Sequence, residues 1–400
     1  MRKIKIIEAG NELGLGGTEY VMQLYCKYLN KDIFDVTALA IHEGGARVEL
    51  IEGMGIQVVI LHGNMDHLAE ILHDVDVFHW HCDGYINSLV FGVIQKNKPT
   101  IVIQTNVFGN FDNSPLYSLI DYDLYISNMI LIRRMYIDSL HPELIPPHLY
   151  ISKRKVLANP VDVDHLVSIL PSDEELENFK NLNNLKNLFI IGRIGRADNS
   201  KFDLITLDGF AEFANEVENA RFLLVGATPE IISYAIELGI YDRLILFETT
   251  NDLKKLMLYY KSLDVFLAAS AIGESFGMVI AEAMTVGVPV ITISTEDRDN
   301  AQIEMVDNNE TGLVVERNAN TIVEAIFNLY QNENIRTKLS ASSRNKILKE
   351  YRAINIVKSL EYLIFDHLKS SLPQSEKSLI KDFSLYMVKE YIYRCSDLWS

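Results

Sequence analysis

Short apolar runs alternate with longer segments whose apolar residues recur at helical spacing along most of this 400-residue chain. Several of the short runs are apolar throughout, as is typical of parallel strands that are covered on both faces. Strands that alternate with helices predict βαβ units and therefore an α/β fold. The predicted strands form two sets: Ile4–Ala9, Asp35–Ile41, Gln57–Leu61, Asp76–His81, Thr100–Asn106 and Leu124–Ser127 in the first, and Leu188–Ile194, Arg221–Gly226, Arg243–Glu248, Asp264–Ser270, Pro289–Ser294 and Gly312–Glu316 in the second.

The two sets of strands predict two domains. A polar stretch at residues 171–186, rich in Glu, Asn and Lys, lies between them and suits a surface segment. The turn-forming pair Asn159-Pro160 precedes that stretch. Open α/β sheets bind ligands beyond the carboxyl ends of their strands, so two such sheets facing each other would leave a cleft as the default site.

Composition fits two globular domains and argues against several classes of protein. Four hundred residues, 48% of them hydrophobic, can build two cores from domains of under about 200 residues each. The net charge of −17 argues against nucleic acid as a partner and weakens the case for an anionic membrane. Three widely spaced cysteines without metal-ligand spacing predict reduced thiols in a cytoplasmic protein. We find no apolar run long enough for a signal peptide or a membrane span.

Two carboxylates lie eight positions apart in the segment Glu274-Ser-Phe-Gly-Met-Val-Ile-Ala-Glu282. A predicted strand precedes this segment, which reads as a tight loop leading into a helix. That order of elements points free backbone N–H groups and the positive end of a helix at an anion. Eight residues make about two helical turns, so both carboxylates could face one side and bind hydroxyl groups that flank a diphosphate. The alternative is a helix cap at Glu274 and a surface Glu282, although the neighbours of Glu282 are apolar.

A glycine-rich loop follows the first predicted strand. Its glycines, Gly16 and Gly17 among them, allow the backbone to approach a phosphate closely. A dinucleotide-binding fingerprint does not fit, because Glu19 occupies the position of its last glycine or alanine. The alternative is a tight turn with a helix cap.

A basic loop opens the second set of strands and contains Arg193, Arg196 and Lys201. Cations after a strand can neutralise a diphosphate and stabilise it as a leaving group. The alternative is a solvated basic loop.

Histidines lie at the end of the predicted strand Asp76–His81. Alternation puts His79 and His81 on one face of the sheet. The pair could contribute to a metal site, but the sequence offers no convincing set of carboxylates beside it. A structural histidine at a strand end is the alternative. Asp83 follows at a turn, which it could simply cap, and Asn106 ends the next predicted strand.

The tail at residues 375–399 carries a stripe of apolar residues at helical spacing: Leu379, Phe383, Met387 and Tyr391. Core packing is our prediction for this stripe. Docking on a protein or a membrane through tyrosine and tryptophan is the alternative. Small basic clusters at residues 133–134 and 153–155 are interpreted as solvated surface.

Several motifs in the second half resemble the group 1 retaining glycosyltransferases of GT-B fold. They are Glu274-x7-Glu282 with its Glu-Ser-Phe-Gly loop, Ala281-Glu-Ala-Met-x-x-Gly-Val-Pro-Val290, and Glu304-Met-Val-Asp-x-x-x-Thr-Gly-Leu-Val314. The likeness covers about residues 1–360 and is weakest in the N-terminal half. It implies a GT-B fold, with two Rossmann-like domains whose parallel sheets face a central cleft. The domains would be an acceptor-side domain at 1–162, a nucleotide-sugar-binding domain at 163–354, and C-terminal helices at 355–400 that pack back on the first domain.

The resemblance also implies roles for individual residues. Glu274, His81, Arg196 and Lys201 would be catalytic. Asp83 and Asn106 are predicted on the acceptor side from their positions at the strand ends alone. Glu274 would hold sugar hydroxyls, and Glu282 would hold the ribose. The set that binds the donor would be Gly16, Gly17, Arg193, Arg196, Lys201, Phe247, Ser275, Phe276, Gly277, Met278 and Glu282.

The sequence departs from the family pattern at two places. The family's interval between its arginine and lysine is shorter than that from Arg193 to Lys201, so either arginine could hold the diphosphate, and Arg196 keeps the shorter spacing. Relatives often carry paired glycines where this chain has Asn300-Ala-Gln-Ile-Glu304, and that departure puts a close backbone approach there in doubt.

The implied enzyme moves a sugar, with retention, from a nucleotide-diphosphate sugar to a hydroxyl of a glycan, glycolipid or small molecule. It would act in polysaccharide or glycoconjugate biosynthesis, in the cytoplasm or peripherally at the inner membrane face. It would need no cofactor and no metal, and Asp121-Tyr-Asp123, which has metal-binding spacing, is interpreted as a turn. A non-catalytic sugar-nucleotide-binding relative and a GT-B sugar-nucleotide epimerase are the alternatives.

Overall fold

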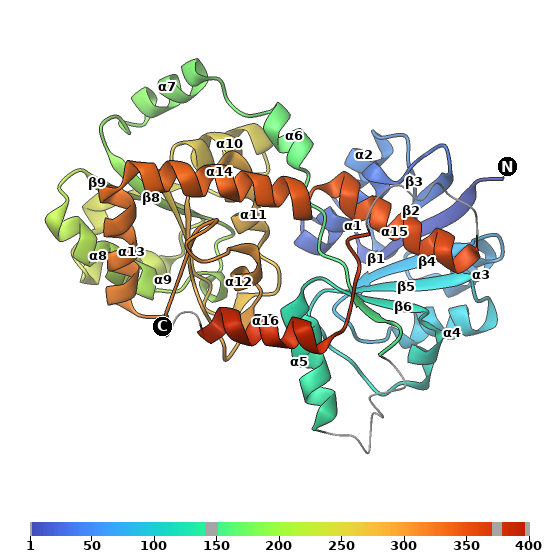
Figure 1. Cartoon of the computed structure of the whole chain (residues 1–400). Coiled ribbons are helices and arrows are strands. Elements are labelled where there is room, and N and C mark those ends of the chain that lie inside the picture. Colours follow the sequence, from blue (N-terminus) through green and yellow to red (C-terminus); the bar gives the residue numbers. More distant parts are fainter. Residues whose placement is uncertain (1, 141–150, 370–377, 397–400) are drawn as a thin grey trace. The chain divides into compact units, whose positions relative to one another are not determined.

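A computed structural model describes residues 2–140, 151–369 and 378–396 (Figure 1). The chain forms two compact units. The first comprises Met1–Pro160 and Glu350–Lys389, and the second comprises Val161–Lys349 and the chain from Glu390 onward.

The first unit is built on an eight-stranded sheet of order β16-β7-β6-β5-β4-β1-β2-β3. Every neighbouring pair is parallel except β16 with β7. The strands are β1 (Ile4–Glu12), β2 (Phe34–Glu43), β3 (Gln57–Ile60), β4 (Val77–Cys82), β5 (Ile101–Asn106), β6 (Tyr122–Tyr125), β7 (Arg154–Val156) and β16 (Lys381–Asp382). The helices are α1 (Gly17–Tyr28), α2 (Arg47–Glu52), α3 (Met65–Leu72), α4 (Ser88–Lys96), α5 (Asn128–Ser139) and α15 (Ala353–Leu368).

Alternate residues of the first sheet pack into two separate cores. Ile6 of β1 lies in a core with α1, α2 and α15, whereas its neighbour Ile7 lies in a core with α3 and α4. Because both faces are covered, the central strands are largely apolar. Buried polar residues interrupt them on β1, β4 and β5, namely Glu8, His79, His81, Gln104, Thr105 and Asn106, and therefore require a reason.

The second unit contains a six-stranded parallel sheet of order β10-β9-β8-β11-β13-β15. Its strands are β8 (Phe189–Ile194), β9 (Ala220–Val225), β10 (Leu244–Phe247), β11 (Val265–Ala268), β13 (Val290–Ile293) and β15 (Leu313–Val315). A separate two-stranded sheet joins β12 (Gly273–Glu274) to β14 (Asp299–Asn300). The helices are α6 (Val163–Ser168), α7 (Asp173–Leu182), α8 (Ile205–Glu216), α9 (Pro229–Glu237), α10 (Leu253–Lys261), α11 (Met278–Val286), α12 (Gln302–Met305), α13 (Ala319–Gln331) and α14 (Glu333–Glu350), and α16 (Leu385–Ser396) runs across the boundary between the units.

Both large sheets reverse their strand order at one place. The reversal lies between β1 and β4 in the first unit and between β8 and β11 in the second. The crossovers on the two sides of such a point leave opposite faces of the sheet, so a crevice opens at the carboxyl ends of the two strands. These two switch points are where the fold predicts ligands.

The α/β fold and all the predicted strands are confirmed, with small shifts at the ends. The short strands β7, β12, β14 and β16 were not predicted. The predicted strand Leu124–Ser127 lies two residues earlier, so Asp123 is inside β6 and its interpretation as part of a turn was wrong. The prediction of one helical stripe from Leu379 to Tyr391 was also wrong, because Leu379 precedes β16 and α16 begins only at Leu385.

Helices that could cross a membrane are not found among the described residues. The polar stretch at 171–186 contains α7, which has no buried residue and begins with a capping box between Ser172 and Glu175.

A half-buried ion cluster joins α14 to the last part of α16, which belongs to the second unit. Nζ of Lys346 donates to the carbonyl of Glu304 at 2.7 Å and lies 2.8 Å from Oδ1 of Asp307. Nη1 of Arg394 donates to the same oxygen at 2.6 Å. The two cations together hold the pKa of Asp307 below its ordinary value, although burial would raise it.

We expect Lys346→Ala to lower the free energy of unfolding by about 2 kcal/mol, because a half-buried carboxylate loses one of its two cations. Lys349→Ala, an exposed position in the last turn of the same helix, is the control and should leave the thermal midpoint unchanged. Equal midpoints for the two variants would show that Arg394 alone satisfies Asp307.

Candidate functional site

A pocket lies at the switch point between β8 and β11 of the second unit. Charged side chains from three separate elements line it: Arg193 of β8, Lys201 of the 3₁₀ turn Asn199–Lys201, and Glu274 of β12. Val279 and Ile280, in the first turn of α11, complete that side of the pocket. Two cations, a carboxylate and the positive end of a nine-residue helix therefore meet at one place.

The backbone before α11 follows a path that only glycine permits. Gly273 has a φ of +74°, and a Cβ at this position would overlap with the carbonyl of Asp299. This close approach pairs β12 with β14. The N–H of Glu274 also donates to Oε1 of Gln302 at 3.2 Å. Gln302 belongs to the segment where paired glycines are absent, and here its side chain helps to fix Glu274.

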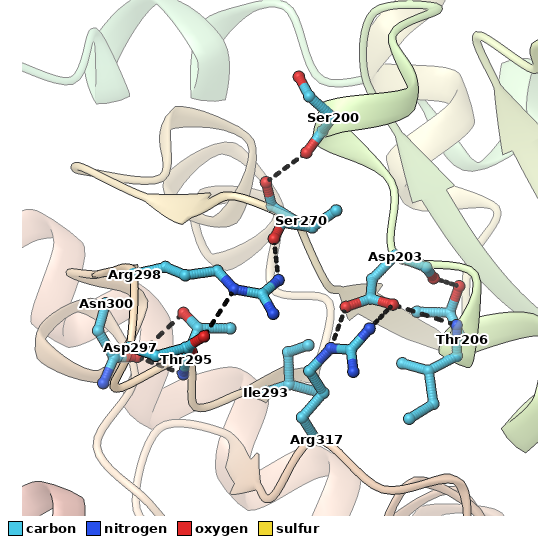
Figure 2. Close-up of polar contacts among 12 residues, drawn as sticks. Ser200, Asp203, Thr206, Ser270, Ile293, Thr295, Asp297, Arg298, Asn300 and Arg317 are labelled. Atoms are coloured by element: carbon cyan, nitrogen blue, oxygen red, sulfur yellow. Dashed lines mark hydrogen bonds and ion pairs between the residues drawn. The ribbon is translucent and has the colours of Figure 1, made fainter.

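Hydrogen bonds around the pocket hold its loops together (Figure 2). Oγ of Ser270 donates to the carbonyl of Ser200 at 3.4 Å, which ties the end of β11 to the turn that carries Lys201. Arg298 donates to the carbonyl of Ala271. Asp203 accepts from Nε and Nη2 of Arg317 at 2.6 and 2.9 Å. A bidentate pair of this kind restricts geometry as well as adding energy.

Arg193 and Lys201 point into the pocket, and Arg196 does not line it. Arg193 is only 5% exposed and donates to the carbonyl of Lys201. Its guanidinium also lies against Gly195, where a Cβ would overlap with Nη1. Burial lowers the pKa of Arg193, and the carboxylate of Glu274 opposes that shift. Arg196 is exposed, so the structure brings together the arginine with the longer spacing and the lysine.

The two carboxylates of the motif lie in different surroundings. Glu274 is on β12, four residues before α11 begins, so the expectation that two helical turns separate it from Glu282 was wrong. Oε2 of Glu274 lies 3.3 Å from Nζ of Lys201. Oε2 of Glu282 instead accepts from the hydroxyl of Tyr260 at 2.8 Å. Burial raises the pKa of Glu282 to about 7, and the Tyr260 hydrogen bond opposes this.

The other residues of the second unit that were predicted to bind the donor are half-buried or buried. Ser275, Phe276 and Gly277 form the loop into α11, with Gly277 as its N-cap, and Met278 is the first residue of the helix. The ring of Phe247 stacks on Tyr259 at 4.7 Å between centroids, and its carbonyl accepts from the N–H of Gly226. Sequence reasoning missed Tyr259 and Tyr260, because they come from α10, which carries no motif.

In the first unit, Gly16 and Gly17 lie where β1 leads into α1. Gly16 is the N-cap, and its carbonyl accepts from Nη2 of Arg47 at 3.4 Å. Nη1 of Arg47 donates to Oε1 of Gln23 at 2.6 Å, so Arg47 joins the loop to the helix. Nothing in the sequence pattern indicated this, since Arg47 follows a different strand.

Asp83 and Asn106 use their polar groups to shape turns. Oδ1 of Asp83 accepts from the N–H of Tyr85 at 3.1 Å, as the capping alternative expected. The buried Asn106 accepts from the N–H of Gly109 and donates to the carbonyl of Asn110. Both side chains therefore form hydrogen bonds within the loops that follow β4 and β5.

His81 and His79 share a carboxylate that the sequence did not reveal. Oε2 of Glu8, on β1, lies 2.6 Å from Nε2 of His81 and 2.9 Å from Nδ1 of His79. Nε2 of His79 lies 2.8 Å from Oγ1 of Thr105. Burial would raise the pKa of Glu8, but the histidines outweigh it and hold that pKa well below its ordinary value. Burial, with help from His79, lowers the pKa of His81.

Glu8, His79 and His81 are also the one group among the described residues whose atoms could hold a metal ion, since one ligand atom of each lies within 4.8 Å of the others. The separations at Glu8 are those of hydrogen bonds, and both rings meet the same oxygen. Asp121 and Asp123 do not form a comparable site. Asp121 pairs with Lys98, and Asp123 is buried against Tyr117.

Comparison with known proteins gives matches in sequence and in structure. Residues 174–346 match the model of the group 1 glycosyl transferases. An N-acetyl-alpha-D-glucosaminyl L-malate synthase of Bacillus anthracis is 28% identical over 167 residues, which are 41% of this chain. The match spans 42% of that relative's length.

Two solved structures illustrate the shared fold. A glycosyltransferase from Rickettsia africae superposes with a TM-score of 0.76 at 18% identity, over 93% of this chain and all of that one. Anabaena HepE in complex with UDP and glucose superposes with a TM-score of 0.71 at 16% identity, over 91% of this chain and all of that one. Likeness at these identities establishes the fold. The chain therefore has the GT-B fold, and the region that matches the group 1 glycosyl transferases contains the pocket of the second unit.

Proposed function

We propose that this protein is a retaining glycosyltransferase that moves a sugar from a nucleotide-diphosphate sugar to an acceptor hydroxyl. One observation carries the proposal: Arg193, Lys201 and the first turn of α11 face the same pocket as the carboxylate of Glu274. The cations and the helix end suit a diphosphate, whereas a carboxylate suits the hydroxyls of a sugar. The complex of Anabaena HepE with UDP and glucose, on the same fold, supports this pairing of ligands.

The ion pair between Lys201 and Glu274 suggests how the pocket accepts its donor. In the free protein, Lys201 and Glu274 neutralise each other at 3.3 Å. A bound diphosphate would draw Lys201 to its oxygens, and Glu274 would then be free to accept hydrogen bonds from the sugar. Arg193 keeps its place, because its guanidinium already donates to the backbone at Lys201.

Catalysis in this proposal consists of positioning and charge stabilisation. The acceptor hydroxyl attacks the anomeric carbon from the face from which the diphosphate leaves. Its proton passes to the departing phosphate oxygen, and negative charge accumulates between Arg193, Lys201 and the N–H groups of Gly277 and Met278. Product stereochemistry then matches that of the donor.

Glu282 is the proposed ribose ligand. The hydroxyl of Tyr260 donates a hydrogen bond to Oε2 of Glu282, which leaves Oε1 to accept one from a ribose hydroxyl. The base would lie near the end of β10, where the Phe247 ring is held by Tyr259. From the first unit we assign Gly16, Gly17 and His81 to substrate binding. We no longer assign Asp83 and Asn106 to the acceptor, because their side chains shape turns. Biosynthesis of a polysaccharide or glycoconjugate is the corresponding role.

The proposal is tested by heating the protein with a panel of nucleotide-diphosphate sugars and then assaying the stabilising ones for transfer. A ligand that binds only the native state raises the thermal midpoint. Stabilisation followed by transfer to a hydroxyl supports the proposal. Stabilisation without transfer to any acceptor would favour a sugar-nucleotide-binding protein, and interconversion of free sugar nucleotides would favour an epimerase.

The two carboxylates should respond differently to substitution. Glu274→Gln should reduce kcat much more than it weakens nucleotide affinity, because its partner is the sugar. Glu282→Ala should mainly weaken nucleotide affinity, measured by calorimetry, because its partner is the ribose. Near-normal turnover and affinity in both variants would refute both assignments.

A pH series provides a control for Glu282. The pKa of Glu282 is about 7, so the carboxyl is increasingly protonated below that pH. It must then lose this proton before it can accept a hydrogen bond from the ribose as a carboxylate. Affinity for a sugar nucleotide, whose phosphates are diesters, should therefore fall as the pH drops below about 7, and Glu282→Ala should lose this dependence.

The cations should matter for turnover. Arg193→Ala and Lys201→Ala should each lower kcat by about 100-fold, as the loss of a charge stabiliser commonly does. Arg196→Ala is the matched comparison, because that side chain is exposed and outside the pocket. The reverse result, with loss only in the Arg196 variant, would assign the diphosphate to Arg196.

Transfer should survive excess EDTA, and the product should keep the donor's anomeric configuration. Positive side chains and a helix end already supply countercharge to the diphosphate. Proton NMR coupling constants of the new linkage identify its configuration. Activity that EDTA abolishes and manganese restores, or an inverted linkage, would contradict the retaining, metal-independent reaction.

A further inference from the structure

Glu8 is a buried acidic residue at the centre of the first sheet. It lies on β1, in register with His79 of β4, and it is fully buried. His81 lies two residues further along β4, at the switch point of the sheet, and is only 2% exposed. The aromatic ring of Tyr25, from α1, lies against both imidazoles, with centroids 5.1 and 5.5 Å away.

A buried carboxylate between two histidines contributes less to stability than apolar side chains of the same volume commonly would. A buried ionised group must recover its desolvation cost from partners, and an apolar residue of similar volume would often be equally or more stabilising. Ile6, two residues before Glu8 on β1, and Tyr25, which contacts both imidazoles, belong to one hydrophobic core. Stability alone therefore does not explain a carboxylate at position 8.

The contacts determine which nitrogen of His81 carries a proton. Glu8 is ionised, because the histidines hold its pKa low, and an ionised carboxylate can only accept hydrogen bonds. Nε2 of His81, at 2.6 Å, must then be the donor. Since its pKa is lowered, His81 is neutral, and the lone pair resides on Nδ1. This Nδ1 is buried, and the described residues provide no hydrogen-bond partner for it.

We propose that Glu8 is a positioning residue, which holds His81 as the Nε2–H tautomer so that Nδ1 accepts a hydrogen bond from a hydroxyl of the bound substrate. The proposal rests on the proposed function, since it assigns that hydroxyl to the sugar donor or its acceptor. It accounts for the carboxylate in the core, for both short contacts of Oε2, and for the unused acceptor on the ring. A metal ion would instead require lone pairs on both nitrogens that face Glu8.

Isotope labelling of histidine tests the tautomer directly. The chain has 10 histidines, and the loss of one set of ¹⁵N–¹³C correlations in His81→Gln assigns His81. The wild type should show the Nε2–H pattern at neutral pH. Glu8→Gln should shift His81 toward a mixture, because an amide can both donate to and accept from the ring.

Kinetics test whether the tautomer matters. Glu8→Gln should lower kcat by about 10- to 100-fold with a nearly unchanged KM for the donor, as removal of an outer partner of an active-site histidine commonly does. Thr105→Val is the control, because it removes the partner of His79 and leaves Glu8 in contact with His81. Its thermal midpoint should fall, while the His81 tautomer and kcat stay as in the wild type.

His81→Gln keeps a donor toward Glu8 and removes the acceptor at Nδ1. The kcat of His81→Gln should fall as much as that of Glu8→Gln. The His81 variant therefore still tests the proposal if Glu8→Gln does not fold. A wild-type His81 protonated on Nδ1, one equivalent of bound transition metal in the purified protein, or a normal kcat in a variant with the mixed tautomer would each overturn the proposal. The NMR measurement needs no turnover, so failure of the wild type to transfer sugar counts against the proposed function alone.

Discussion

A parallel sheet forces every connection to return from the carboxyl edge to the amino edge, and in each unit the connections change face at one point. That reversal keeps the carboxyl ends of two adjacent strands clear of crossing helices. In the second unit, Arg193 is the last residue but one of β8, and the chain after β11 forms β12 and the loop into α11. The polar groups of the pocket depend on this constraint, because their elements are far apart in sequence.

Much of the architecture could be predicted from sequence, because continuous apolar strands follow directly from burial on both faces. The two-residue strands β12 and β16 could not, since so short a strand has no hydrophobic pattern. The basic loop was predicted, but the choice between Arg193 and Arg196 was not. Spacing counts residues along the chain, whereas the 3₁₀ turn at Asn199–Lys201 determines which arginine meets Lys201 in space.

Residues that act through other residues were the least visible in the sequence. Glu8, Arg47 and Tyr260 belong to no motif, and each meets its partner across a gap of many residues. Their identification required the strand order and the helix packing. Residues that belong to a motif, such as Glu274 and Lys201, were named from the sequence, and both line one pocket.

The path of Arg193 past Gly195 carries a consequence for evolution. A side chain at position 195 would displace the head of the arginine and leave the backbone undisturbed, because the three nearest atoms all belong to the guanidinium of Arg193. Such a change would cost little stability and yet remove a charge from the pocket. The order of substitutions in a lineage is therefore constrained. Under the proposed function, a descendant that first moved the diphosphate contact to Arg196 could later accept almost any residue at position 195, whereas the opposite order would pass through an ancestor that lacks this contact.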